Sequence, residues 1–451
     1  MALNAAVTLD GAEIGRAQAV QAEAAGVAAE AAMNPILLKA DSDHTCQVVL
    51  MGRSLGSFRA AEYRLMRRRL WPQVESSLND LRRRFDLVLI EGAGSPAEVN
   101  LRRGEMVNMR VAAAAESPVV LIGDIDRGGV FAALLGTLSL LRPAERRRVA
   151  GLVVNRFRGD PDLFTDGVAF LEKRSRLPVL GVVPHVQVRL PAEDSLELEG
   201  LVSPARGAVV DVVVLRFSRI SNFDELQPLA AEPGVRLRLV DDPDRLGQPD
   251  LIILPGSKAT ADDLGRARAS GLADAILTAA GQGTAVLGIC GGYQMLGQRI
   301  NDPGGVERSG NHPGLGLLPS TVAFEPAKIT ARRTVRVLRA PGLLQRAAGL
   351  ATSGYEIHMG RWQGEARPVL AVDDRPDGCA SPDGWIVGTS VHGLLADRDV
   401  RRALLESLAA RKGAVLPPRG PEPVDPYDLL ADHLDRHLDV AALDRIAGLA
   451  G

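Results

Sequence analysis

One cysteine of the sequence has neighbours that are typical of a catalytic nucleophile. An apolar run at 285–289 leads into the motif Gly-Ile-Cys-Gly-Gly at 288–292, and a helical pattern follows. Glycines on both sides of a cysteine permit the sharp strand-to-helix turn that exposes a nucleophilic side chain. A helix N-terminus favours the thiolate form, and the Gly291 N–H can donate to an oxyanion. The pattern therefore predicts nucleophilic thiol chemistry at Cys290, the alternative being a buried structural cysteine.

A cysteine nucleophile needs a base, and three histidines of the second half of the chain are candidates. His392 follows the apolar run 385–391 and precedes a glycine, and strand ends of this kind are where active-site groups of α/β proteins collect. His358, in the motif Gly-Tyr-Glu-Ile-His-Met-Gly at 354–360, is the second choice, and His312 is typical of a loop. We therefore expect His392 to act as the base.

Two strand ends in the first half of the chain carry residues that suit a nucleotide. The apolar run 87–90 ends in Glu91, and the run 152–154 ends in Asn155. An acid at a strand tip is well placed to hold Mg²⁺ on a nucleotide phosphate, and we interpret Asn155 as a reader of the base. The glycines and alternating charges of 123–131 either bind an anion or make a turn.

The phosphate-binding loop that usually accompanies such strand tips is missing. None of the five lysines follows a glycine, so the motif G-x-x-x-x-G-K-[ST] does not occur. The chain opens instead on an Ala-rich helical pattern over 13–33, whereas an α/β domain usually begins with a strand and its first βα turn. The sequence thus predicts an α/β domain with nucleotide-type strand tips but without its first strand and phosphate-binding loop.

A βαβ rhythm along the chain predicts the elements that position these residues. Apolar runs without polar alternation indicate strands buried on both faces, and they lie at 87–90, 119–122, 152–154, 179–183, 209–215, 235–240, 251–254, 285–289 and 385–391. Helical patterns intervene, for example at 58–84, 128–141 and 162–175. We expect an α/β fold with two doubly wound parallel sheets, in domains 1–205 and 208–451, the second ending in an amphipathic helix near 426–447.

Composition excludes several classes of function. The 451 residues carry a formal net charge of -2, so no excess of positive charge favours nucleic acid. The three cysteines, Cys46, Cys290 and Cys379, form no C-x-x-C pair, which argues against a disulfide scaffold or a thiolate zinc site and for a reducing compartment. No uncharged apolar run reaches the ~18 residues that span a membrane. We expect a cytoplasmic protein in which Cys46 and Cys379 are inert.

The chain resembles one enzyme family from Met1 to its end. The motifs that carry the resemblance are, in order, those at 1–4, 10–18, 33–39, 42–49, 91–98, 123–129, 155–160, 220–223, 254–258, 288–292 and 354–360. By them the chain is identified as a member of the cobyric acid synthase family, the glutamine-dependent amidotransferases of cobalamin biosynthesis. The Asp-Arg-Gly-Gly segment at 126–129 separates this family from the related cobyrinate a,c-diamide synthases.

The resemblance implies a class I glutamine amidotransferase-like domain in the second half of the chain. Cys290 would be its nucleophile and His392 its base, with oxyanion donors at Gly291 and Gly256. Class I glutaminases usually carry a glutamate two residues after the histidine, but that position is Leu394 here. The resemblance therefore implies a Cys–His dyad, and no third catalytic residue is assigned.

The first half resembles the dethiobiotin-synthetase-like ATPases. The resemblance implies that ATP and Mg²⁺ activate carboxylates of adenosylcobyrinic acid a,c-diamide, which are then amidated at the b, d, e and g positions with ammonia from glutamine. Glu91, Glu13 and Asp10 would be the metal-side acids, and Asn155 and Glu91 would bind the nucleotide.

Family members carry a strand and a Gly-rich P-loop-like segment ahead of the stretch that begins here at Met1, so the resemblance implies an N-terminally truncated synthetase domain. Three alternatives remain open at this point. In the first, the chain is a glutaminase subunit with a degenerate synthetase half. In the second it is an inactive fragment, and in the third it is a MinD/ParA-like switch joined to a glutaminase fold without activity.

Overall fold

The computed structural model of the chain describes residues 4–40, 45–188, 190–191, 207–364, 367–420 and 424–449. They form two units, each assembled from two separate stretches of sequence. The first unit comprises Met1–Ala60 and Pro191–Pro421, and the second comprises Ala61–Leu190 and Glu422–Gly451. Among the described residues, no helix combines the length and the apolarity that crossing a membrane would require.

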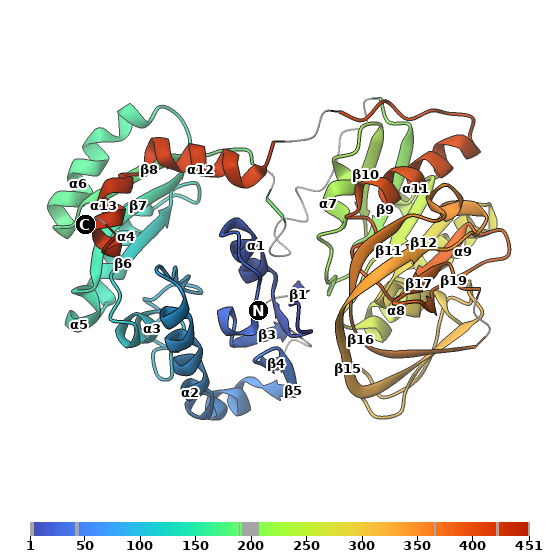
Figure 1. Ribbon diagram of the computed structural model, residues 1–451, viewed down its shortest axis with the longest axis horizontal. Helices are drawn as coiled ribbons and strands as arrows, with labels where there is room; N and C mark the ends of the chain where they lie inside the picture. The colour runs from blue at the N-terminus through green and yellow to red at the C-terminus, as the bar shows by residue number, and fades with distance from the viewer. Residues whose placement is uncertain are drawn as a thin grey trace. The chain divides into compact units, whose positions relative to one another are not determined.

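A six-stranded sheet forms the centre of the first unit, in the order β10-β9-β11-β12-β20-β19 (Figure 1). The first five strands are parallel, and the short β19 is antiparallel. Their bounds are β9 Val210–Leu215, β10 Val235–Val240, β11 Leu251–Leu254, β12 Ala285–Ile289, β19 Cys379–Ala380 and β20 Ile386–Thr389. The sequences of β11 and β12 are apolar and buried throughout, as strands covered on both faces must be.

Helices cover this sheet and connect its parallel strands. They are α7 Leu226–Ala230, α8 Thr260–Ala269, α9 Leu272–Gly281, α10 Gly291–Leu296 and α11 Arg398–Arg411. Side chains from the sheet and from these helices share one hydrophobic core. The parallel order brings the carboxyl ends of β9, β11, β12 and β20 to one edge, where the site described below lies.

A second, largely antiparallel sheet is formed by strands that follow α10 in the sequence. It contains β13 Arg299–Asp302, β14 Gly310–Pro313, β15 Ser320–Val337, β16 Ala351–Gly364, β17 Leu370–Val372 and β18 Arg375–Asp377. The pairing of the long strands β15 and β16 shifts register between Phe324 and Ile329. Alternation along β16 sends Tyr355 and Ile357 to one face and Glu356 and His358 to the other.

The amino-terminal stretch folds onto this unit as two small antiparallel sheets. Their strands are β1 Ala5–Val7 with β2 Glu13–Gly15, and β3 Ile36–Ala40 with β4 Thr45–Leu50 and β5 Arg53–Arg59. The helix α1 Arg16–Ala24 and the 3-10 turn η1 Ala31–Met33 lie between them in sequence. The helical pattern over 13–33 is therefore only partly helix, because Glu13–Gly15 pairs with Ala5–Val7.

The second unit has a three-stranded parallel sheet, β6-β7-β8. Its elements are β6 Val119–Asp124, β7 Val149–Phe157, β8 Val179–Pro184, α2 Ala60–Arg84, α3 Met109–Ala114, α4 Val130–Leu140, α5 Pro143–Arg146, α6 Thr165–Ser175, α12 Pro426–His437 and α13 Val440–Ala447. The last two helices pack on β8 through apolar side chains that include Leu434, Leu438 and Ile446 (Figure 1).

The α/β fold class is confirmed, but two expectations differ from the structure. Residues 87–90 form no strand, and Leu89 is 85% exposed, because this apolar run pairs with no described strand and so lacks the neighbours that would bury it. The compact units also differ from domains 1–205 and 208–451. Residues 1–60 pack with the second domain, and the carboxyl-terminal helices pack with the first.

We predict that Gly181→Ala detaches the carboxyl-terminal helices from β8. A Cβ at position 181 would lie 2.3 Å from the His437 carbonyl oxygen and 2.7 Å from Leu438 Cδ2. Forcing extra volume into packed contacts costs ~1–3 kcal/mol of unfolding free energy, measured by chemical denaturation. Gly136→Ala in α4 is the control, because nothing lies within 4 Å of its Cβ position. Equal stability of the two variants would contradict the packing described here.

Candidate active site

Cys290 occupies a sharp turn between β12 and α10. Its φ of 50° and ψ of −104° lie in a region that residues with a side chain rarely adopt. The sulfur donates to the Ile357 carbonyl at 3.8 Å, and Cys290 is also close enough to His392 to raise its pKa. Backbone strain of this kind is characteristic of nucleophile elbows, where it aims the side chain at the substrate.

Close backbone approaches explain why glycines surround the elbow. A Cβ on Gly292 would lie 1.8 Å from the Leu254 carbonyl oxygen, and one on Gly291 would lie 2.7 Å from the Ser257 nitrogen. Only glycine permits the end of β11 and the start of α10 to touch in this way. The turn after β11, which contains Gly256, is thereby held beside the elbow.

His392 lies three residues beyond the end of β20 and is fully buried. Its Nδ1 is 3.0 Å from Oε1 of Glu225, whose Oε2 accepts a hydrogen bond from the Gly393 N–H at 3.2 Å. Glu225 is itself only 2% exposed and comes from the segment between β9 and α7. Cys290, His392 and Glu225 thus form one buried group, in which Glu225 is hydrogen-bonded to His392.

The charge on His392 follows from its two partners. Burial disfavours the imidazolium, but the hydrogen bonds to Cys290 and Glu225 outweigh it and raise the pKa of His392 to about 10. A histidine ordinarily titrates near pH 6.5. The arrangement therefore favours the imidazolium form of His392 at neutral pH.

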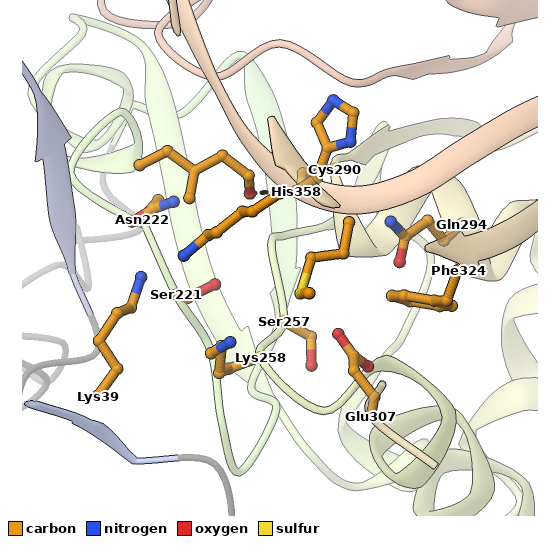
Figure 2. A pocket seen from close by; sticks show the side chains of 13 residues that line it. Lys39, Ser221, Asn222, Ser257, Lys258, Cys290, Gln294, Glu307, Phe324 and His358 are labelled. Atoms are coloured by element: carbon orange, nitrogen blue, oxygen red, sulfur yellow. Dashed lines mark hydrogen bonds between the residues drawn. The ribbon is translucent and has the colours of Figure 1, made fainter. Parts of the chain in front are cut away.

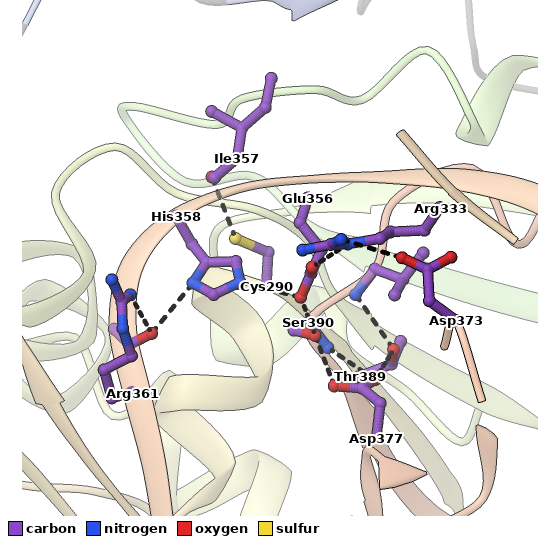
Figure 3. Close-up of polar contacts among 12 residues, drawn as sticks. Cys290, Arg333, Glu356, Ile357, His358, Arg361, Asp373, Asp377, Thr389 and Ser390 are labelled. Atoms are coloured by element: carbon purple, nitrogen blue, oxygen red, sulfur yellow. Dashed lines mark hydrogen bonds and ion pairs between the residues drawn. The ribbon is translucent and has the colours of Figure 1, made fainter. Parts of the chain in front are cut away.

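His358 has a different environment on the neighbouring strand β16 (Figure 3). Its Nδ1 faces the Gly360 carbonyl oxygen at 2.9 Å, and its Nε2 faces Oε1 of Glu356 at 3.1 Å. Burial opposes ionisation of Glu356, but hydrogen bonds from His358 and Arg333 lower its pKa to about 2. Both ring nitrogens of His358 thus face oxygen atoms of Gly360 and Glu356. His358 is therefore not placed to accept a proton from Cys290.

A pocket opens in front of the Cys290 sulfur (Figure 2). It is lined by Lys39, Ser221, Asn222, Ser257, Lys258, Cys290, Gln294, Glu307, Phe324, Lys328, Ile357, His358 and Met359. Burial raises the pKa of Glu307 to about 7, despite the opposing charge of Lys258. Three of the five lysines of the chain line this one pocket, although arginine is the dominant basic residue elsewhere.

Glu13 joins two of these lysines. Its Oε1 is 2.8 Å from Lys39 Nζ, its Oε2 is 2.5 Å from Lys328 Nζ, and its side chain is 1% exposed. Burial would raise the pKa of Glu13, but the two lysines hold it well below its ordinary value. Lys328 also donates to Gln47 at 3.1 Å, and burial lowers the pKa of Lys328 to about 7 against the attraction of Glu13.

Of the other residues predicted to bind metal or nucleotide, Asp10 does not line this pocket, and Glu91 and Asn155 belong to the second unit. Asp10 accepts a hydrogen bond from Thr8 in the exposed turn between β1 and β2. Glu91 lies in an irregular, exposed segment of the second unit, and Asn155 is near the end of β7, where its Oδ1 accepts from the Arg156 N–H at 2.8 Å. In the described parts of the chain, no three acidic, histidine or cysteine side chains converge as metal ligands.

Glu13 and Asp10 of the first unit do not fit a Mg²⁺ site as they stand. Mg²⁺ prefers several oxygen ligands in a near-octahedral arrangement. Both oxygens of Glu13 are directed at lysine ammonium groups, and Asp10 is held by its own turn. The geometry assigns Glu13 an ion-pair role.

Glu225 was not predicted from the sequence, because the family pattern places the glutamate at position 394, two residues after the histidine. Leu394 is 2% exposed and apolar, and the carboxylate beside the histidine comes instead from 167 residues earlier. A usable signal existed, since Glu225 follows the parallel strand β9 and acids beyond such strand ends gather at one edge of the sheet.

A strained cysteine elbow, a histidine beyond a neighbouring strand and a parallel sheet define the first unit as a glutamine amidotransferase-type domain. Residues 211–400 match the family model of the CobB/CobQ-like glutamine amidotransferase domain, and residues 60–190 match that of an AAA domain.

The full chain is similar to cobyric acid synthases of several bacteria. It is 48% identical to that of Sorangium cellulosum, covering 100% of this chain and 91% of the relative. It is 45% identical to those of Moorella thermoacetica and Rhodobacter capsulatus, covering 100% and 99% of this chain and 90% and 92% of the relatives. The chain belongs to the cobyric acid synthase family, as the resemblance predicted, and is an enzyme with a glutamine amidotransferase domain.

We predict that Glu13→Gln destabilises the first unit. Removing the carboxylate leaves two lysine ammonium groups facing each other in a buried site, and breaking a buried ion pair costs ~3–5 kcal/mol of unfolding free energy. Chemical denaturation measures the loss.

Glu325→Gln is the control, because the side chain of Glu325, which pairs with Arg361, is 54% exposed. An exposed ion pair of this kind contributes less than ~1 kcal/mol to the unfolding free energy. A Glu13→Gln variant of unchanged stability that loses Mg²⁺ affinity would instead support the metal-ligand assignment.

Proposed function

We propose that this chain is a cobyric acid synthase that hydrolyses glutamine at Cys290 and uses the ammonia for ATP-dependent amidation. The observation that carries the proposal is the buried group of Cys290, His392 and Glu225 in front of the pocket, in a member of this family. The substrate that the family resemblance implies is adenosylcobyrinic acid a,c-diamide, amidated at its b, d, e and g carboxylates.

The first half of the glutaminase reaction uses the ion pair at the elbow. The Cys290 thiolate attacks the side-chain carbonyl carbon of glutamine, and the carbonyl oxygen becomes an oxyanion. Backbone N–H groups of Gly291 and Gly256 are the proposed donors to that oxyanion. The His392 imidazolium then protonates the leaving nitrogen, so that ammonia departs and a thioester remains.

The second half of the reaction releases glutamate. Neutral His392 takes a proton from water, and the hydroxide attacks the thioester carbonyl. Collapse of the tetrahedral intermediate expels the Cys290 thiolate, which restores the ion pair with the protonated histidine. The Glu225 carboxylate fixes the Nδ1–H tautomer and stabilises the imidazolium.

The synthetase reaction rests on the family and on the AAA-domain match. ATP would activate a corrinoid carboxylate, which ammonia then converts to the amide. Asn155 and Glu91 remain the proposed nucleotide-side residues. Because both carboxylate oxygens of Glu13 face lysines and Asp10 is held by its own turn, we derive no step through the metal.

We predict that Cys290→Ser abolishes glutamine hydrolysis, because a hydroxyl is a far poorer nucleophile than a thiolate near neutral pH. Amidation of the corrinoid with added ammonium chloride, followed by mass spectrometry, should survive. Glutamate formation is the measure of hydrolysis.

Cys379→Ser is the matched control, since Cys379 is buried in the same unit without an elbow. Wild-type hydrolysis by the Cys290 variant would refute the nucleophile assignment. Hydrolysis by the unaltered chain without amidation from either nitrogen source would favour a glutaminase that supplies ammonia to a separate partner.

We further predict that Glu225→Gln lowers the kcat of glutamine hydrolysis by ~10²-fold or more, within the ~10²–10⁴-fold range of a positioned general base. The neutral amide keeps the shape but removes the charge that holds the proton on His392. Steady-state kinetics of glutamate formation measure the effect, and kcat near the wild-type value would exclude Glu225 from the mechanism.

The same variant should show a characteristic pH dependence of stability. The folded pKa of His392, about 10, exceeds its ordinary value, so the stabilisation is complete below about pH 6.5 and is lost as pH rises through 10. The destabilisation by Glu225→Gln should therefore be greatest at about pH 6.5 and below, and it should fade as pH rises to about 10. Glu232→Gln, which disturbs a buried pair with Arg401, is the control without this pattern.

A further inference from the structure

The segment Ser221–Glu225 contacts the catalytic histidine on one side and the amino-terminal stretch on the other. Glu225 is hydrogen-bonded to His392, as described above. Asn222, three residues earlier, accepts a hydrogen bond from the Ala5 N–H at 3.1 Å, and Asp224 forms an ion pair with Arg16 at 3.0 Å. All of these residues belong to the first unit.

The contact with Ala5 sets the orientation of the Asn222 amide. A backbone N–H can donate only to the amide oxygen, so Oδ1 faces Ala5 and Nδ2 faces the other way, 3.5 Å from His392 Nε2. Asn222 is 4% exposed and has a φ of 52°, in the left-handed region. A buried, strained loop of this kind keeps its shape only where its surroundings hold it.

The contact with Arg16 reaches the imidazole by a second path. Tyr355 Oη donates to Asp224 Oδ1 at 3.4 Å, and the Tyr355 ring stacks on His392 with centroids 5.2 Å apart and planes at 16°. The backbones of Tyr355 and His392 also pair, with hydrogen bonds of 3.1 and 2.9 Å. Burial and the Asp224 charge keep the pKa of Tyr355 well above its ordinary value, so the hydroxyl remains a donor.

Apolar packing joins the same elements. Ala5 and Val7 of β1 share a buried cluster with Ile357, against which Tyr355 also packs. The Ile357 carbonyl is the one that accepts from the Cys290 sulfur. The hairpin β1–β2 therefore contacts the strand that flanks both the nucleophile and the base.

We propose that the hairpin Ala5–Gly15 and Arg16 complete the glutaminase site, and that Arg16 is a positioning residue that acts on His392 through Asp224 and Tyr355. The inference rests on the proposed glutaminase function. The amino-terminal hairpin lies outside residues 211–400, which match the amidotransferase model, so the first part of the chain supplies a support that this domain lacks by itself. Any displacement of the hairpin would change the rate of glutamine hydrolysis.

The test compares Arg16→Ala and Arg16→Lys with the unaltered chain. Misplacing catalytic groups through a distant support costs ~10- to 10²-fold in rate, and we expect Arg16→Ala to lower kcat by that factor. The KM for glutamine should stay within ~2-fold, because Arg16 is absent from the pocket lining. Arg16→Lys should restore most of kcat, since it keeps the charge opposite Asp224.

Two further measurements separate positioning from a general loss of structure. Asp224→Asn should lower kcat similarly, and the double variant with Arg16→Ala should be no slower than either single variant, because both break one interaction. Arg419→Ala is the control, since Arg419 forms an ion pair of 2.7 Å with Asp399 that does not involve the loop.

Wild-type kcat in Arg16→Ala would overturn the positioning role while leaving the glutaminase function intact, provided that Cys290→Ser is inactive. A chain without glutamine hydrolysis would instead overturn the proposed function. If Arg16→Ala does not fold, Arg16→Gln and Asp224→Asn are judged by the same kcat and KM criteria.

Discussion

A fully buried histidine, His392, lies at the centre of the candidate site, and any charge on it has to be stabilised by its neighbours. The cost of burying an imidazolium is offset by Cys290 and by Glu225, which contacts Nδ1, and both raise the pKa of His392. Three segments must meet at one sheet edge to supply those groups: the elbow after β12, the end of β20 and the loop after β9. The parallel order of the first unit brings them together, and the glycines at the elbow let them approach closely enough.

Features encoded by neighbouring residues could be predicted from the sequence, whereas features that depend on distant partners could not. The elbow at Cys290 and the buried strands of the second half were predictable because glycine spacing and apolar runs are local signals. Glu225 was not, because its partner is 167 residues away and an acidic residue in a loop has no distinctive pattern. The run 87–90 shows the converse: an apolar sequence becomes a strand only where neighbouring strands pair with it.

Glu13 illustrates how the same residue type supports opposite interpretations. The family resemblance implies a metal-side role for this acid, but the structure surrounds it with Lys39 and Lys328. Those lysines are contributed by β3 and by the irregular part of β15, so no local pattern in the sequence relates them. The exchange of terminal segments between the compact units has the same origin, since which sheet a helix or hairpin covers depends on surfaces that form only in the fold.

The gathering of lysines at the pocket also makes this protein chemically unusual. Besides Lys39, Lys258 and Lys328, only Lys173 and Lys412 carry side-chain amines, and both are exposed. Acylating reagents attack unprotonated amines, and burial brings the pKa of Lys328 to about 7, whereas a lysine ordinarily titrates near 10.4. A small amine-directed label that enters the pocket would therefore modify very few positions. Modification of Lys328 by such a reagent would report on the space in front of Cys290.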